Sequence, residues 1–237
     1  MNWKQILTAL LIVFLVWPIA TQAQQQSQFL TDYEYGKLQL DAMMKDRPKM
    51  KDLVSTQDRI YSWTARQFGG SSCGSKIAWK NDSMYLSRLG YMAESHPRDK
   101  NSSAFIRVSR YDLQGKERAA KDLWHDVAFE LMNVSNGPQY DQLYKKAVES
   151  KYSKEEFLKQ ATMLEYEADK KTVAIYYYLW LPLMKHKHID SNQCSWPSIP
   201  STYKSWISQH RTTDYPRDSW GKYYDVYLLP VIKGIVK

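Results

Sequence analysis

The sequence predicts an α+β fold that is predominantly α-helical and contains a small sheet. Several long stretches place apolar residues three to four positions apart, which is the period of an amphipathic helix. One stretch, AFIRVSRYD at residues 104–112, instead alternates apolar and polar residues, as a strand with one solvated face does. Capping residues and turn formers bound the helical stretches, so helices should make up most of the fold.

The first 23 residues have the layout of a secretory signal peptide. Lys4 precedes an apolar run from Ile6 to Val16, and Ala23 ends the segment. The run is too short to cross a bilayer comfortably, although an uncleaved anchor is the alternative. Cleavage would leave one exported domain at residues 24–237, secreted or periplasmic and without a stable membrane span.

The helix expected at residues 114–133 is called the central helix below. The elements expected before it are helices over residues 29–46 and 50–68, a short strand at 76–79, a strand or helix at 83–92, a surface turn at 96–103 and the strand at 104–112. Pro48 separates the two helices, and the pair Gly69-Gly70 ends the second.

From the central helix onward, the expected elements are helices over residues 114–133, 140–149, 153–184 and 203–210. The turn formers SNGP end the first of these helices, and Ser153 and Glu156 form a capping box that begins the third. Pro182 could break the third helix near its end. The remainder of residues 185–237 is expected to be an aromatic-rich irregular segment. No internal repeat and no long linker divides the chain.

The net charge suggests an anionic partner, and the two cysteines suggest a disulfide bond. The exported part carries a formal net charge of +7, because residues 1–23 contribute only Lys4 to the total of +8. This charge favours an anionic cell-envelope or extracellular partner and no nucleic acid, with general solubility as the alternative. Cys73 and Cys194 predict a disulfide in an oxidising compartment. A nucleophilic thiol at Cys73 is the other reading.

The central helix contains the segment HDVAF. In zinc metallopeptidases, His-Glu-x-x-His places two imidazoles one turn apart, with the glutamate as base. Here His125 is the first histidine, Asp126 stands in place of the glutamate, and Phe129 occupies the second histidine position. Asp122, one turn before His125, could accept a hydrogen bond from the imidazole as an orienting group.

The helix at 153–184 contains EYEAD, with Glu165, Ala168 and Asp169 in order. A histidine-bearing helix after a strand, followed by such a helix, resembles the zincin-type metallopeptidases whose third zinc ligand is a glutamate. The resemblance covers residues 104–184. It implies a zincin-like core with vestigial ligands His125 and Glu165 that face each other, and a vestigial base at Asp126. Because the second histidine is missing, no cofactor is expected, with zinc as the alternative.

Plainer readings compete with each motif. A lone histidine beside aromatic residues is often a core residue, and EYEAD is often a solvated helix face. The pair His186 and His188 could bind a metal or form a solvated basic turn. Aromatic residues near the C-terminus could form an exposed ligand surface or pack onto the body; they are Trp196, Trp206, Trp220, Tyr223 and Tyr224.

The predicted function is an exported binding or regulatory protein on a zincin-like scaffold that has lost catalysis. One alternative is a module that binds an envelope polymer or a protein and has no metallopeptidase kinship. The other is an active secreted hydrolase that uses His125, Asp126, Glu165 or Cys73. The sequence contains no phosphate loop, dinucleotide fingerprint or serine-nucleophile elbow, which disfavours most nucleotide-dependent chemistry.

Overall fold

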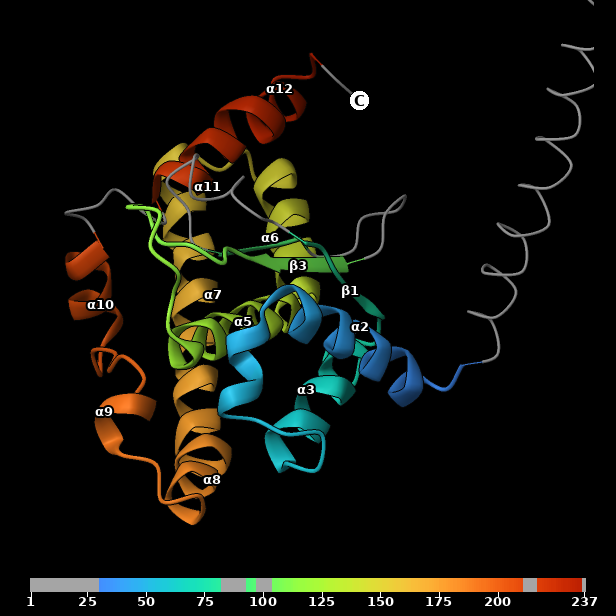
Figure 1. Cartoon of the computed structure of the whole chain (residues 1–237). Coiled ribbons are helices and arrows are strands. Elements are labelled where there is room, and N and C mark those ends of the chain that lie inside the picture. The colour runs from blue at the N-terminus through green and yellow to red at the C-terminus, as the bar shows by residue number, and fades with distance from the viewer. Residues whose placement is uncertain (1–29, 82–92, 97–103, 211–216, 236–237) are drawn as a thin grey trace, which may run out of the picture.

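A computed structural model describes residues 30–81, 93–96, 104–210 and 217–235. The predicted signal peptide at 1–23, the stretch at 83–92 and nearly all of the turn at 96–103 lie outside these ranges. The predicted fold class is confirmed, because the described chain is mainly helical with one small sheet (Figure 1). Among the described residues, no helix has both the length and the apolar character needed to span a membrane.

The described elements in chain order are α2 (Asp32–Asp46), the 3₁₀ turn η1 (Pro48–Asp52), α3 (Arg59–Phe68), β1 (Ile77–Trp79), β2 (Ala93–His96), β3 (Ala104–Val108), α5 (Ala120–Ser135), α6 (Gly137–Glu149), α7 (Lys154–Ile175), the π-helical turn η2 (Tyr176–Trp180), α8 (Leu181–His186), α9 (Ser191–Cys194), α10 (Tyr203–His210), α11 (Arg217–Tyr223), the π-helical turn η4 (Tyr224–Leu228) and α12 (Leu229–Ile232).

The sheet has three strands in the order β1-β3-β2, with β1 parallel and β2 antiparallel to β3. The helix α5 packs against β2 and β3. Ile106 and Val108 of the central strand are fully buried. The strand is shorter than predicted, because the chain bends after Ser109 and a hairpin closes between Tyr111 and Glu117.

The helices α2 and α3 cross closely at a glycine. A Cβ atom on Gly36 would lie only 1.7 Å from the carbonyl oxygen of Ala65, so only glycine allows this approach. The predicted helix at 50–68 is wrong in its first half. Residues 48–52 form the 3₁₀ turn, and α3 begins after Asp58, whose carboxylate accepts from the Ser55 amide.

The helices α5 and α7 pack against each other and cross at the centre of the molecule (Figure 1). The predicted burying face of α5 is confirmed, since Leu123, Val127, Leu131 and Val134 are all buried. Trp124 extends this face and donates its indole N–H to the carbonyl of Met50 at 3.0 Å. These residues belong to the first core, which α2, α3, the sheet, α5 and the C-terminal part of α7 share.

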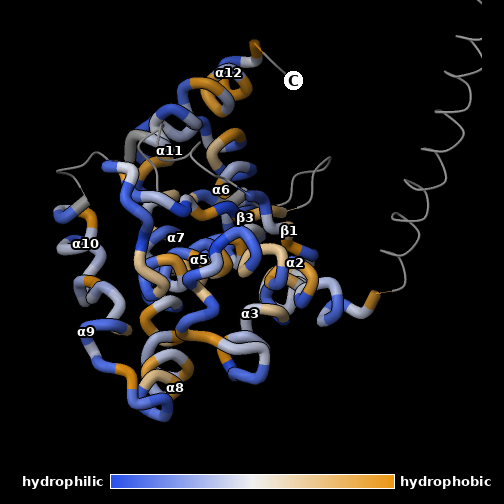
Figure 2. The backbone as a smooth tube through the Cα atoms, viewed as in Figure 1, coloured by the Kyte–Doolittle hydropathy of each residue, from blue (hydrophilic) through white to orange (hydrophobic). Residues whose placement is uncertain are grey.

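The predicted helix at 203–210 is confirmed as α10, but the rest of the described segment after residue 185, which was predicted to be irregular, is mostly helical as well. The helices α9 and α10 lie along α7 on the side opposite α2 and α3 (Figure 1). The segment α11–η4–α12 packs on α6 and α7 and forms the second core with them, around Leu143, Phe157, Tyr224 and Leu228. Hydrophobic residues occur along these helices and in α12 near the C-terminus (Figure 2). Large aromatic side chains thus supply a second buried cluster, which weak sequence periodicity concealed.

Two π-helical turns with related sequences each precede a proline. YYYLWLP at 176–182 and YDVYLLP at 224–230 both begin with tyrosine and end with Leu-Pro. In each turn, the N–H of that leucine bonds to the carbonyl oxygen of the tyrosine five residues earlier. A proline inside an α-helix clashes with the carbonyl four residues before it, and a wider turn relieves this clash. The predicted break at Pro182 is therefore a wide turn, and the helix continues to His186.

The predicted Cys73–Cys194 disulfide is absent, and both thiols are free. Cys73 lies in the turn after α3, where its Sγ donates to the carbonyl of Ser75 at 3.0 Å. Cys194 is buried at the end of α9, where its carbonyl accepts from the Trp180 indole N–H. Each cysteine is held by its own local contacts, and an even cysteine count carries no information on whether two Cα atoms approach within bonding range.

Candidate functional site

Two cavities meet at His125. The first, of about 220 Å³, lies between α7 and residues 196–199; the second, of about 600 Å³, lies beside the hairpin at residues 111–117. His125 and Pro197 line both cavities. The imidazole therefore forms part of the wall between an aromatic chamber, the name used below for the first cavity, and a polar chamber, the second.

The imidazole of His125 is oriented by a hydrogen bond to Asp126, which is in turn paired with Arg118. Its Nδ1 donates to Asp126 Oδ1 at 3.0 Å, and Asp126 Oδ2 accepts from Arg118 Nη2 at 2.6 Å. Arg118 also donates to the carbonyl of Ser109, at the end of the central strand. Burial alone would raise the pKa of Asp126, but the hydrogen bond from His125 and the charge of Arg118 outweigh it. The pKa of this carboxyl lies below its ordinary value, so Asp126 is ionised at neutral pH.

The orienting partner of His125 is therefore not the predicted one. Asp122 lines the polar chamber without a hydrogen bond to the imidazole, and the neighbouring Asp126 takes that role. The difference arises because Arg118 precedes α5 and draws the Asp126 carboxylate into position. No sequence pattern marks Arg118, since it lies outside the helix it acts on.

The segment after α9 covers the aromatic chamber. Trp180 fixes the start of this segment by donating its indole N–H to the Cys194 carbonyl at 2.6 Å. Trp196 then packs against Trp180 in a tilted arrangement, with 4.9 Å between ring centroids, and meets His125 edge-on at 5.6 Å. Only 8% of Trp196 is exposed, so this ring is a packed wall of the chamber and not a free surface.

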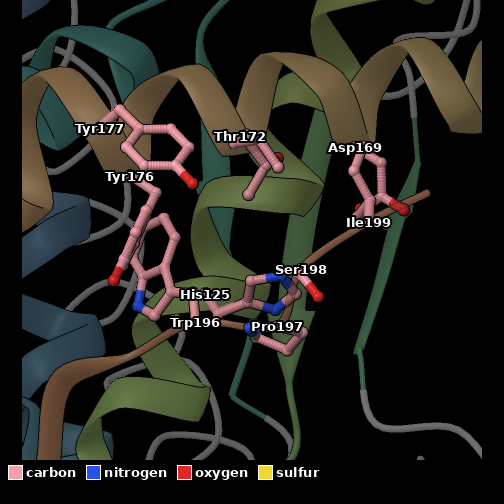
Figure 3. A pocket seen from close by; sticks show the side chains of 10 residues that line it. His125, Asp169, Thr172, Tyr176, Tyr177, Trp196, Pro197, Ser198 and Ile199 are labelled. Atoms are coloured by element: carbon pink, nitrogen blue, oxygen red, sulfur yellow. The ribbon is translucent and has the colours of Figure 1, made fainter. Parts of the chain in front are cut away.

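The opposite wall comes from one face of α7 and its π-helical turn. Figure 3 shows Asp169, Thr172, Tyr176 and Tyr177 reaching from this helix toward the space beside His125. Asp169 is held in place because its Oδ2 accepts from the Trp206 indole N–H at 2.6 Å. The chamber therefore combines aromatic faces, hydroxyl groups, a carboxylate and an imidazole, which can bind a small polar group with an apolar face.

Glu165 is not part of this site. Its Oε1 accepts from Asn133 Nδ2 and from the Trp220 indole N–H, each at 3.2 Å. Asn133 lies eight residues after His125 on α5, which is about 12 Å along the helix axis. Burial raises the pKa of Glu165 to about 7, although the hydrogen bonds from Asn133 and Trp220 lower it. The structure thus brings Asp169, and not Glu165, into the chamber with His125.

The residues at this site do not fit a zinc ion. His125 uses Nδ1 to bind Asp126, and the other Asp126 oxygen is bound to a cation, Arg118. Phe129 has no donor atom, and Glu165 is directed elsewhere. Within the described ranges, no three histidine, cysteine or acidic side chains gather as metal ligands. A catalytic zinc site requires three protein ligands around one point, and these donors are divided between separate places.

The other predicted site residues are also dispersed. The ligand-surface candidates do not form an exposed face: Trp196, Trp206 and Tyr224 are buried, while Trp220 and Tyr223 are half-buried in the second core. These large rings fill the space between short helices, which explains why they pack inward.

Both histidines of the KHKH segment are exposed at the end of α8. Between them, Lys187 turns inward and donates to the Leu53 carbonyl at 2.8 Å and to Asp58 at 2.5 Å. The segment therefore anchors the end of α8 to the loop before α3.

A scan against protein-family models, a search of curated proteins and a search of solved structures each found no match for this chain.

Proposed function

We propose that this protein is an exported binding module without peptidase activity, and that it holds an anionic cell-envelope polymer at the two chambers beside His125. The observation that carries the proposal is the single imidazole shared by both chambers and fixed by Asp126 and Trp196. A hydrogen-bonding side chain that is immobilised before the ligand arrives loses little freedom on binding, which favours affinity.

The chemistry of the aromatic chamber supports a sugar ring as the bound unit. A volume of about 220 Å³ is small, and it is lined by the rings of Tyr176 and Tyr177 on one wall and of Trp196 on the other. Aromatic faces pack against the apolar face of a pyranose, while Asp169 and His125 can hydrogen-bond its hydroxyl groups.

Charge and the N-terminal residues support the location and the partner. A net charge of +7 on residues 24–237 attracts acidic polymers, and residues 1–23 have signal-peptide character. Kinship with the zincin scaffold is a separate proposal, supported by the strand-helix-helix order and by the packing of α5 on α7. Such kinship would concern the scaffold alone, because function resides in the site.

The test is co-sedimentation of the purified protein with peptidoglycan sacculi, at low salt and at 0.5 M salt. We expect binding that falls about tenfold in His125→Ala and weakens with salt. The matched control is His186→Ala, because His186 is exposed on α8 and outside both chambers. Equal binding by the two variants, or no binding by the parent protein, would refute the proposed function.

A hydrolase is the second candidate, and one observation favours it. Ser198 lines the same chamber as His125, whose Nδ1 is bound to a carboxylate as in a nucleophile-base-acid arrangement. In this case His125 would take the proton of the Ser198 hydroxyl during attack on an acyl carbon. Covalent labelling by a fluorophosphonate that disappears in Ser198→Ala and in His125→Ala, but not in His186→Ala, would establish this candidate instead.

A further inference from the structure

We infer that the ligand is an acidic polysaccharide chain, and that it continues from the chamber beside His125 across Tyr177 and Tyr178 on the outer face of the π-helical turn. This inference rests on the proposed function and deepens it, since it names the ligand class and adds a second contact region. The region formed by Tyr177, Tyr178 and Pro182 is called the tyrosine platform below.

The tyrosine platform is continuous with the chamber. Tyr176 and Tyr177 both line the aromatic chamber, and their rings meet edge-on at 5.1 Å. Tyr177 is 59% exposed and Tyr178 is 77% exposed, so the aromatic lining extends from the cavity to the open surface. Of the two exposed tyrosines, a ligand confined to the chamber would contact only Tyr177, whereas the inferred chain would also contact Tyr178.

Two large exposed tyrosines in succession are unusual in a helix that is otherwise well packed. The proline requirement explains the wide turn but not the choice of tyrosine at its exposed positions. The related turn η4 shows that other residues serve there, because Asp225 and Val226 stand where the first turn has Tyr177 and Tyr178. Exposed phenol rings offer a flat apolar face and a hydroxyl group, which match the two kinds of surface on a sugar ring.

Lysines at both ends of the platform indicate the charge of the chain. Lys170 and Lys171 are exposed on α7 before the tyrosines, and Lys185 is exposed on α8 after them. Lys171 bonds to the neutral groups of Ser135 and Asn136, so its charge is not cancelled by them. Lys170 shares an exposed contact with Glu167 at 2.7 Å, which solvent weakens. An acidic chain running along this face would therefore meet a cation before and after the rings.

The experiment measures affinity against chain length by calorimetry, with oligogalacturonates of one to eight units as the acidic probe and cello-oligosaccharides of one to six units as the neutral probe. We expect affinity for the acidic series to rise with length beyond two units. Tyr178→Ala should weaken the longest acidic oligomer by about three- to tenfold and leave the monomer unchanged. Lys185→Ser should weaken only the acidic series.

Matched controls come from the second π-helical turn. Tyr227→Ala removes a tyrosine that is 64% exposed in η4, and Lys233→Ser removes an exposed lysine at the end of α12. Neither should change binding. If sacculi bind and His125→Ala abolishes this binding, but affinity for the oligomers does not rise with length, only the inference fails. The inference is also overturned if the neutral series binds as tightly as the acidic series. The same holds if Tyr178→Ala and Tyr227→Ala have equal effects on binding.

Discussion

The side chains of Asn133 and Glu165 are joined by a 3.2 Å hydrogen bond, which holds a buried carboxyl two helical turns from His125. Trp220 completes this contact from α11, so Glu165 links the central helix pair to the C-terminal helices. Only 5% of Glu165 is exposed, so we expect its role to be structural. Its ionisation should affect the stability of the fold more than the properties of the site.

Glu165 should make the protein less stable as the pH rises. Its pKa is about 7 in the folded protein and 4.5 ordinarily, so the folded state binds more protons between these values. The contribution of Glu165 is full below pH 4.5 and is lost as the pH rises to about 7. We expect Glu165→Gln to raise the free energy of unfolding at pH 8 by on the order of 1 kcal/mol, and less at pH 4.5. Urea unfolding across this range measures the effect, and Glu149→Gln, at an exposed site, is the control.

Removal of Arg118 should destabilise the protein through Asp126. Arg118→Met leaves the Asp126 carboxylate without its cation, at an expected cost on the order of 3 kcal/mol at pH 7. The pKa of Asp126 is lowered, so the contribution of the pair is full above the ordinary value of 3.8, and this loss should shrink as the pH falls below that value. The double variant Arg118→Met/Asp126→Asn should recover part of the loss, as measured by urea unfolding. Additive effects of the two changes would show that the pair is not coupled.

Gly36→Ala should destabilise the crossing of α2 and α3. The new Cβ would lie 1.7 Å from the Ala65 carbonyl oxygen, so the helices must separate, at an expected cost of about 3 kcal/mol. Gly221→Ala in α11 is the matched control, because the nearest atoms to its Cβ belong to the flexible side chain of Lys154. Thermal unfolding should show a lower midpoint for the first variant only. An unchanged midpoint in Gly36→Ala would contradict the close crossing.

The cysteines should both titrate as thiols. We expect two reactive thiols per chain in denaturant without reductant, and none if the disulfide forms. In the native protein Cys73 should react faster, because Cys194 is only 1% exposed and burial raises the pKa of its thiol. Timed reaction with a chromogenic disulfide reagent measures both quantities. Cys73→Ser should remove the fast phase.

Sequence periodicity was sufficient to predict the helices α5 and α7 but not to predict which of their side chains meet at the site. The buried face of α5 and the capping box at Ser153 follow from local patterns, and both are confirmed. Which residue of α7 faces His125 depends on the register of α7 against α5. The spacing of side chains within one helix does not determine this register. Asp169 and Glu165 are one turn apart, so a one-turn difference in register decides between them.

The helices α11 and α12 were missed for a related reason. They are short, and their burial depends on aromatic rings that fill gaps between helices and not on a repeating apolar face. The segment at residues 196–199 could be recognised only in part, through Trp196. Its position over His125 is set by a contact of Trp180 with a backbone carbonyl, which no residue pattern reveals.

The π-helical turn at Tyr176–Trp180 contains one residue more than a regular helix would use. One added residue rotates everything downstream by about 100° about the helix axis. The helix formed by α7 and α8 is thereby divided into two sections whose side chains face different directions about the axis. The first section directs Thr172 toward the chamber, and the second directs Met184 into the core. Deleting Leu179 would restore a regular α-helix and rotate Met184 away from its buried position, so this single added residue lets the two sections pack against different neighbours.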